Sequence, residues 1–512
     1  MGLTIEVILV SSPRRDADRG EEEATGKEVR NLGVPALRGS LHINGTWCEA
    51  DSGRTVGVTN PATEETFCRV GYGGQAETER AIGAAAQAFK TWRAMTAYER
   101  AMPLKKTAEL LRQRVEEIAR TLTMEQGKPL SEAKIEVLAT ATFFEYFAEE
   151  GKRVRGEVVP ASFRNKRLFI LYQPVGVCAM ISPWNFPLFL QGRKIAPALA
   201  AGCTCVCRPS TATPLSLVKL FECMEDAGVP AGVANLVIGP ADACMEAFYA
   251  APELRQISFS GSTGVGKEIM RRAAEQVKKI SIDLGGHAPF IAMPDYGAEE
   301  AAKFAALSKF RNAGQSCIAA SRFYVQEDIF DGFVEAAVAE ARKRVLGNGL
   351  DENVTMGPMA VASQRDKTLH LVEDAVSKGA KVLTGGRRPP HLAKGFFVEP
   401  TVLTGITRDM AIMREEPFCP VMPIIPFKTL DQALEMANDS TYGLASYVAT
   451  RDISAAVKLA EGLECGIVSI GDFSPATVQA PFGGWKESGI GREGGTEGIH
   501  EYLESKYVAL AL

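Results

Sequence analysis

This sequence lacks the features that mark several special classes of protein. No run approaches the ~20 uninterrupted apolar residues that a membrane span requires. The formal net charge is −5, so the chain as a whole offers no basic field, and neither nucleic acid nor a membrane is an expected partner. Eleven cysteines spread over 512 residues do not indicate a disulfide scaffold. The hydrophobic fraction of 46% and the charged fraction of 23% are those of an ordinary soluble protein.

Metal-binding patterns are also scarce. The five histidines are scattered along the chain. Cys203, Cys205 and Cys207 alternate, and alternate residues of a strand project from one face. This pattern favours a stripe of small core side chains over a metal site, which normally uses loop-borne pairs and further cysteine or histidine ligands. We expect no bound metal.

The first 38 residues differ from the rest. They lack the basic start and clean cleavage site of a signal peptide. Residues 12–30 are dense in both charges, which is typical of disordered chain, and they are too acidic for an organelle transit peptide. We interpret residues 1–38 as an extension without function and expect a cytoplasmic protein.

A chain of 512 residues is too long for one compact core, so two or more domains are expected. Short apolar segments alternate with amphipathic helical ones, which indicates doubly wound parallel α/β sheets. The expected strands are 174–183, 203–210, 234–240, 256–261 and 290–293, and the expected helices between them are 216–228 and 263–277. Two long helices are predicted upstream, at 98–127 and 132–151. Residues 167–173 and 506–512 are compatible with strands.

A cysteine and an asparagine provide the elements of covalent catalysis. Cys317 ends the run FRNAGQSC (310–317), where a glycine and small or polar neighbours favour a loop that exposes the sulfur. Asn185, in PWNFP (183–187), has an amide that can donate to an oxyanion formed when this sulfur attacks a carbonyl.

The run GSTGVGK (261–267) is similar to a phosphate-binding loop, but Glu268 stands where a hydroxyl residue should bind Mg²⁺. Its glycines, Gly261, Gly264 and Gly266, also lack the spacing of a GxGxxG fingerprint. A strand, a glycine-containing turn and a helix start remain, and these form a general anion site.

From about Gly39 onward, the chain closely resembles the aldehyde dehydrogenase superfamily. The resemblance rests on motifs that occur in the family's order: PWNFP, SFSGSTGVG (258–266), DLGG (283–286), FRNAGQSC, EEPF (415–418) and PFGG (481–484). Within the superfamily, FRNAGQSC, GREGG (491–495) and EYLESKY (501–507) are similar to the succinate-semialdehyde dehydrogenase branch.

The resemblance implies two doubly wound parallel-sheet domains and a small β arm for oligomerisation. The dinucleotide-binding domain would comprise residues 39–152 and 174–285, and the catalytic domain residues 286–490. The arm would comprise residues 153–173 and 491–512. We therefore expect a homodimer or homotetramer.

The resemblance also implies an NAD or NADP site. Gly261, Ser262 and Gly266 would face the pyrophosphate, Glu416 and Phe418 would hold the nicotinamide ribose and ring, and Trp184, Arg208, Ser210 and Thr211 would complete the site. Cys419 stands where the family has a glycine, so the backbone there is open to question.

The run RPSTATP (208–214) bears on the choice of cofactor. Arg208 replaces a lysine of the family, and Thr211 replaces the glutamate that binds the adenosine ribose. Loss of the carboxylate removes repulsion toward a 2′-phosphate, and a guanidinium can bind phosphate through two hydrogen bonds. These changes favour NADP, or the use of both NADP and NAD, although drift at a tolerant strand end is an alternative.

The resemblance implies that Cys317 forms a thioester and that a carboxylate activates water to hydrolyse it. Asp283 stands where the family has glutamate, one methylene longer. A water relay could restore its reach, Glu493 could share the role, or deacylation could be slow.

Arg193 and Arg311 match arginines that bind the substrate's distal carboxylate in the succinate-semialdehyde branch, and Phe482 joins them as a substrate-binding candidate. We expect a small anionic aldehyde, with succinate semialdehyde first. The serine that completes this group in the branch falls near Ala476, beside Thr477, so another semialdehyde or a sulfonated or phosphonated aldehyde stays open. Ala319 replaces a second cysteine of some relatives, so no regulatory disulfide with Cys317 is expected.

Two functions of other classes are alternatives. One is a nucleotide-binding module built on GSTGVGK, which the missing hydroxyl residue disfavours. The other is a catalytically inactive structural relative, which the altered base at Asp283 makes conceivable. Retention of both Cys317 and Asn185 favours an active enzyme.

Overall fold

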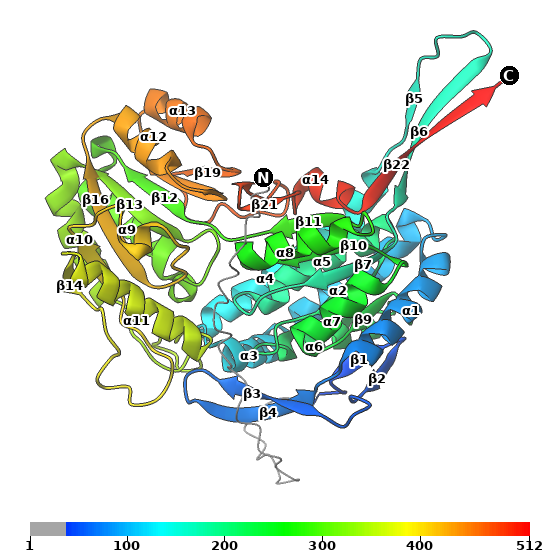
Figure 1. Ribbon diagram of the computed structural model, residues 1–512, viewed down its shortest axis with the longest axis horizontal. Helices are drawn as coiled ribbons and strands as arrows, with labels where there is room; N and C mark the ends of the chain where they lie inside the picture. Colours follow the sequence, from blue (N-terminus) through cyan, green and yellow to red (C-terminus); the bar gives the residue numbers. More distant parts are fainter. Residues whose placement is uncertain (1–36) are drawn as a thin grey trace, which may run out of the picture.

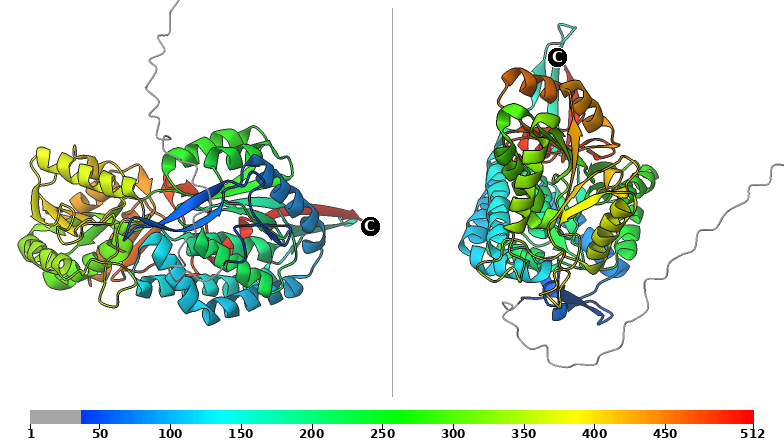
Figure 2. Two further views of the ribbon diagram at one scale, coloured as in Figure 1. Left: turned by 90° about the horizontal axis from the view of Figure 1, so that it is seen from below. Right: turned by 90° about the vertical axis from the view of Figure 1, so that its left-hand side faces the viewer.

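The computed structural model describes residues 37–512 of the chain. These form two α/β units, each with its own sheet and core, and a narrow three-stranded arm that projects from one unit (Figures 1 and 2). The predicted fold class is confirmed. Residues 1–36 of the predicted extension lie outside the described part. Arg38, which the prediction also assigned to the extension, is anchored by ion pairs with Glu225 and Asp226.

The first unit is built on an eight-stranded sheet in the order β2-β1-β9-β8-β7-β10-β11-β21. Its five central strands are parallel, and four of them fall on segments that the sequence predicts. The strands are β1 (Leu41–Ile43), β2 (Thr46–Cys48), β7 (Val177–Ile181), β8 (Thr204–Arg208), β9 (Ala234–Leu236), β10 (Leu254–Ser260), β11 (Lys279–Asp283) and β21 (Gly489–Ile490). Cys203, Cys205 and Cys207 are fully buried on and beside β8, which confirms the core interpretation.

The helices of this unit are α1 (Gln75–Trp92), α2 (Ala97–Gln113), α3 (Val115–Gln126), α4 (Leu130–Glu150), α5 (Pro187–Ala201), α6 (Leu215–Asp226), α7 (Ala241–Ala250) and α8 (Thr263–Ala274). A separate hairpin consists of β3 (Thr55–Asn60) and β4 (Glu65–Gly71). The prediction of a single helix over 98–127 is wrong, since the helix is interrupted at Arg114, between α2 and α3. The apolar pattern continues across a one-residue break, so periodicity alone does not detect it.

The second unit has a seven-stranded sheet in the order β14-β15-β16-β13-β12-β18-β19, in which only β14 is antiparallel to its neighbour. Its strands are β12 (Ala288–Ala292), β13 (Ala320–Gln326), β14 (Lys381–Thr384), β15 (Thr401–Thr404), β16 (Val421–Phe427), β18 (Ala445–Ala449) and β19 (Ile467–Ile470). Its helices are α9 (Ala298–Phe310), α10 (Phe330–Arg342), α11 (Ala362–Ser377), α12 (Leu430–Asn438) and α13 (Ile453–Gly462). A small ladder joins β17 (Tyr442–Gly443) to β20 (Trp485–Lys486).

The arm is a sheet in the order β22-β6-β5, and the C-terminus lies at its tip (Figure 1). Its strands are β5 (Glu157–Val159), β6 (Lys166–Pro174) and β22 (Leu503–Ala511), and α14 (Gly495–His500) leads into it. The antiparallel pairing of β6 with β22 brings together the two predicted strands, although more than 300 residues separate them.

The strand ends position the site. In parallel α/β sheets, ligands bind beyond the carboxyl ends of the strands. Asp283 is the last residue of β11, Ser260 is the last of β10, and Asn185 lies between the end of β7 and the start of α5. The second unit contributes Cys317, which lies between α9 and β13.

Candidate active site

Cys317 lies on a tightly held loop. Just before it, Asn312, Ala313 and Gly314 have left-handed backbone conformations, with φ of 49°, 52° and 73°. The Asn312 side-chain amide holds this backbone by donating to the main-chain oxygen of Asn185 at 2.9 Å. Strained conformations of this kind concentrate at functional sites. Burial and the nearby carboxylate of Asp283 raise the pKa of the Cys317 thiol, so the thiol needs a proton acceptor before it can act as a nucleophile.

Asn185 is buried beside this loop. Its side-chain nitrogen donates to the main-chain oxygen of Gln315 at 3.2 Å. The main-chain oxygen of Asn185 accepts from Lys128 at 2.8 Å as well as from Asn312. These bonds fix the orientation of the amide. Because an amide nitrogen carries two N–H groups, one stays available for an oxyanion at Cys317.

Two cavities meet at Cys317. One, of about 230 Å³, lies at the carboxyl ends of β10 and β11 and is closed from the other side by residues of the second unit, and the other, of about 320 Å³, is bordered by α4 and α5. Asn185, Leu190 and Cys317 line both cavities. A nucleophile that borders two cavities can meet a different molecule from each side.

The first cavity contains five of the predicted cofactor-binding residues: Trp184, Gly261, Ser262, Glu416 and Phe418. Ser262, which lines the cavity, is the N-cap of α8, so this helix begins at the cavity wall, where a helix N-terminus can bind an anion. Glu416 accepts a hydrogen bond from the Gly286 N–H at 3.0 Å, and burial raises the pKa of its carboxyl to about 7.

Four other predicted cofactor residues do not line this cavity. Arg208 donates to the main-chain oxygen of Gly239 at 3.0 Å, and Ser210 and Thr211 lie in the turn after β8. Gly266 has a packing role, because a Cβ there would lie 2.4 Å from the side chain of Leu284.

The strained backbone near the cofactor cavity falls one residue earlier than the sequence suggests. Phe418 has a φ of 51°, whereas Cys419 does not have a positive φ. Cys419 is fully buried, and the ring of Phe418 packs edge-on against Trp184, with centroids 5.6 Å apart. The replacement of glycine by Cys419 is therefore compatible with the local backbone.

Asp283 belongs to a buried ring of charged and polar side chains. Its Oδ2 accepts from Arg193 at 2.8 Å and from Ser260 at 3.3 Å. Arg193 also pairs with Glu493, Glu493 pairs with Lys194, and Lys194 donates to Ser260 at 2.9 Å. Burial raises the pKa of Asp283 to about 6, against the opposing effect of Arg193. This value suits a general base near neutral pH.

Glu493, the other predicted candidate base, is placed differently. It lines neither of the two cavities, and Arg193 and Lys194 engage its two oxygens. These two cations lower the pKa of its carboxyl against the effect of burial. The geometry thus favours Asp283, which faces the cavity that contains Cys317.

The second cavity contains all three predicted substrate residues, Arg193, Arg311 and Phe482. The two arginines differ in their partners. Arg193 is 2% exposed, lies over the Phe482 ring at 4.1 Å and is balanced by two carboxylates, Asp283 and Glu493. Arg311 is partly exposed and forms no hydrogen bond or ion pair with any other residue in the range 37–512. The charge of Arg193, which the sequence predicts to bind a substrate anion, is therefore already balanced within the protein.

Several residues of the site were not predicted. Lys194 and Ser260 complete the ring around Asp283, and Ser474 and Gln479 line the second cavity. A signal for Lys194 exists, since it and Arg193 are adjacent cations in an otherwise apolar helix. Thr477, whose hydroxyl donates to Gln479, was considered and also lines this cavity.

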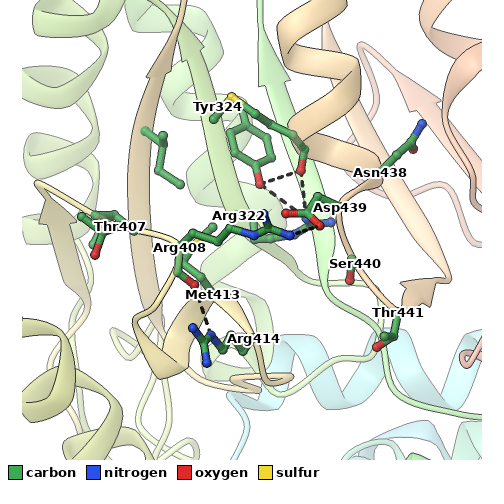
Figure 3. Close-up of a pocket in the computed structure, with 13 residues that line it drawn as sticks. Arg322, Tyr324, Thr407, Arg408, Met413, Arg414, Asn438, Asp439, Ser440 and Thr441 are labelled. Carbon is green, nitrogen blue, oxygen red and sulfur yellow. Dashed lines mark hydrogen bonds and ion pairs between the residues drawn. The ribbon is translucent and has the colours of Figure 1, made fainter.

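A larger cavity, of about 960 Å³, lies in the second unit away from Cys317 (Figure 3). Its arginines are engaged by the protein. Arg322 donates to main-chain oxygens, including those of His287 and Ala437 at 2.9 Å each, and Arg408 pairs with Asp439 (Figure 3). No cysteine, histidine or buried carboxylate lines it, so it lacks the groups that Cys317 and Asp283 supply at the other site.

The structure also bears on the alternative functions. In a nucleotide-binding loop the lysine of the GSTGVGK run would bind phosphate, but here Lys267 pairs with Glu487 at 2.8 Å. Within residues 37–512, no group of histidine, cysteine, aspartate and glutamate side chains could hold a metal ion, and no helix could cross a membrane.

Together, the two α/β units, with a cysteine between two cavities, have the arrangement of an enzyme class that performs covalent chemistry. The model of the aldehyde dehydrogenase family matches residues 47–508. The chain therefore belongs to this family, and the predicted enzyme class, an NAD(P)-dependent aldehyde dehydrogenase, is confirmed.

Individual relatives are similar over nearly their whole length. Glutarate-semialdehyde dehydrogenase of Pseudomonas putida is 45% identical, over 93% of this chain and 98% of the relative. 3-Sulfolactaldehyde dehydrogenase of Pseudomonas putida is 46% identical, over 93% and 97%. Succinate-semialdehyde dehydrogenase [NADP(+)] of Escherichia coli is 44% identical, over 92% and 97%. The crystal structure of succinate-semialdehyde dehydrogenase from Burkholderia pseudomallei has a TM-score of 0.91 and 42% identity, covering 95% of this chain and all of that one.

Proposed function

We propose that this enzyme oxidises a small aldehyde with a negatively charged distal group to the carboxylic acid, with succinate semialdehyde as the first candidate. The observation that carries the proposal is Arg311, a cation in the wall of the second cavity without an ion-pair partner among residues 37–512. A substrate anion would balance its charge, and a hydrogen bond to a charged group contributes about 1.5–3 kcal/mol.

The names of the relatives support an anionic substrate without selecting one. Glutarate semialdehyde and succinate semialdehyde each carry a carboxylate, and 3-sulfolactaldehyde carries a sulfonate. Ser474, Thr477 and Gln479 provide further polar groups in the same cavity, where they could help bind either kind of anion. A different acid semialdehyde or a sulfonated aldehyde is the second candidate.

The first cavity fits a nicotinamide dinucleotide. Its walls combine the open N-terminus of α8, suited to a pyrophosphate, with the carboxyl group of Glu416, suited to ribose hydroxyls. The cofactor would supply hydride acceptance on this side of Cys317. NADP is proposed over NAD, because Thr211 brings no negative charge to the end of β8 and the Escherichia coli relative is named for NADP.

The residues of the site have complementary roles in this chemistry. Asp283 can accept the thiol proton of Cys317, and the thiolate attacks the aldehyde carbon. The Asn185 amide and the Cys317 N–H stabilise the oxyanion. Loss of hydride from this adduct leaves a thioester on Cys317. Asp283 releases the first proton to solvent and then takes a proton from the water that hydrolyses the thioester. Passing this second proton to the departing thiolate releases the acid and regenerates the thiol.

An assembly of two or four copies is part of the proposal. The arm exposes apolar side chains that a partner could cover, including Val158, Phe163 and Leu510, which are 74%, 63% and 49% exposed. A three-stranded sheet with open edges and exposed apolar residues is also a template for pairing with another chain.

The experiment is a panel of aldehydes assayed with NAD and with NADP, followed by absorbance of the reduced cofactor. Succinate semialdehyde, glutarate semialdehyde and 3-sulfolactaldehyde should have a higher kcat/KM than butanal, a neutral aldehyde similar in length to succinate semialdehyde. Equal or better use of butanal would reject the anionic substrate, and no turnover with any aldehyde would favour the inactive relative.

A further inference from the structure

Arg193 connects the two cavities. Its side chain lines the cavity proposed for the substrate, yet its Nη2 donates to Asp283, which lines the cavity proposed for the cofactor. It lies over the Phe482 ring at 4.1 Å and over the Phe189 ring at 5.4 Å, and these rings fix the plane of the guanidinium. The side chain of Arg193 is therefore held against Asp283, the proposed base.

The hydrogen bonds distinguish the two oxygens of Asp283. Oδ2 accepts from both Arg193 and Ser260. Oδ1 is buried and has no hydrogen-bond partner among residues 37–512. A buried carboxylate oxygen without a partner is costly, so it should readily accept a hydrogen bond from water or a thiol. The interactions of Oδ2 thus leave Oδ1 as the atom that can take a proton.

Charge balance explains why Arg193 is needed. Asp283 and Glu493 are two carboxylates in one buried cluster, and two like charges there disfavour each other. Arg193 lies between them and pairs with both, while Lys194 binds Glu493 from the other side. Without Arg193, the cluster would contain two carboxylates and one cation.

We propose that Arg193 is a positioning residue for the base: it keeps Asp283 ionised, with Oδ1 free, during hydrolysis of the thioester. Its charge is used within the protein, so it contributes little to recognition of the substrate anion, which falls to Arg311. This inference rests on the proposed roles of Cys317 and Asp283, and it assigns different functions to the two arginines of one cavity.

The inference predicts the pH dependence of deacylation. After a first burst of reduced cofactor, turnover enters a slow phase whose rate is that of thioester hydrolysis. Asp283 accepts a proton only when ionised, so the rate of this slow phase should fall as the pH drops through the pKa of Asp283, and this fall is the acid limb of the pH profile. An opposite charge nearby lowers a carboxyl pKa by roughly 1–3 units, so Arg193→Met should move this acid limb upward by at least one pH unit. Glu493→Gln should move it downward, because it removes a repelling charge. The groups that act on Asp283 are Arg193 and Lys194 from α5, Ser260 from β10, Glu493 after β21, and, across the cavity, Cys317 and Glu416.

The test is rapid mixing of the full-length enzyme with NADP and either succinate semialdehyde or butanal, from pH 5 to 9. For Arg193→Met, we expect an unchanged burst amplitude and, at pH 7, a slow phase reduced by at least about twofold with both aldehydes, because a one-unit rise of a pKa near 6 lowers the ionised fraction from about 0.9 to about 0.5. Arg193→Lys keeps the charge and should restore part of the loss. Arg311→Met is the matched control, and its acid limb should stay in place.

A second measurement does not depend on turnover. Difference infrared spectroscopy of the enzyme without cofactor follows the carbonyl band of protonated Asp283, identified by its absence in Asp283→Asn. This band should persist to higher pH in Arg193→Met and vanish at lower pH in Glu493→Gln.

Different outcomes reject different statements. An acid limb and a carbonyl band that stay in place in both variants would show that Arg193 has only a structural role. A rise in KM for succinate semialdehyde alone would assign Arg193 to substrate recognition. A wild-type enzyme without a burst or any thiol-dependent product would reject the proposed roles of Cys317 and Asp283 instead.

Discussion

The two cavities that meet at Cys317 are built in different ways. The proposed cofactor-side cavity is formed largely by turns at the ends of strands, where backbone N–H groups and a helix N-terminus would do much of the binding. The substrate-side cavity is formed by side chains from α4, α5 and the segment 474–482. Local sequence motifs therefore describe the first cavity well, whereas the properties of the second depend on which distant groups pair with its charges.

The largest effect should come from the residue that both cavities share. Cys317→Ala removes the atom that forms the thioester, so turnover should fall by at least about 10⁴-fold. Cofactor affinity, measured by titration of protein fluorescence, should be nearly unchanged. Cys68→Ser, a half-buried cysteine of β4, is the control and should retain full activity. Substantial turnover in Cys317→Ala would refute its role as the nucleophile.

The next effect concerns the base on the cofactor side. Asp283→Asn keeps the shape of the side chain but cannot accept a proton, so steady turnover should fall roughly 10²–10⁴-fold. A burst of reduced cofactor should remain if only deacylation is impaired. Asp283→Glu should alter the slow phase most, because it adds one methylene of reach. If Asp283→Asn turns over normally, Glu493 becomes the next candidate.

A smaller effect should separate the substrate side from the cofactor side. Arg311→Met should raise KM for succinate semialdehyde about tenfold or more, because ~1.4 kcal/mol already corresponds to a factor of ten. KM for butanal and for NADP should stay close to the wild-type values. Equal losses with both aldehydes would mean that Arg311 supports the structure of the cavity.

The smallest effect should lie at the far end of the cofactor side. Thr211→Glu introduces a negative charge near the expected 2′-phosphate, so KM for NADP should rise several-fold while KM for NAD changes little. We expect the difference between NADP and NAD to be small, because Arg208, the predicted phosphate ligand, already donates to the main-chain oxygen of Gly239. A wild-type enzyme that strongly prefers NAD would show that the changes at 208 and 211 are drift.

The sequence predicted most of the architecture because parallel strands and their helices have strong local patterns. It missed the break at Arg114, and it assigned Arg38 to a disordered extension although this residue is anchored to α6. It also assigned residues 286–490 to one domain, whereas β21, near the end of this range, pairs with β11 in the first sheet. These features depend on contacts with distant segments, which periodicity does not encode.

The sequence by itself determined the family and located the predicted nucleophile, Cys317, because the motifs that carry both are contiguous runs with their own chemistry. Only the tertiary structure decided which charges are already balanced. Arg193 and Asp283 are 90 residues apart in the chain, and Lys194 and Glu493 are 299 apart. Folding buries them in one cluster, and the low dielectric of the interior strengthens the attraction between opposite charges there. The same fold leaves Arg311 without such a partner among the residues described, so the functions that we propose for the two arginines differ.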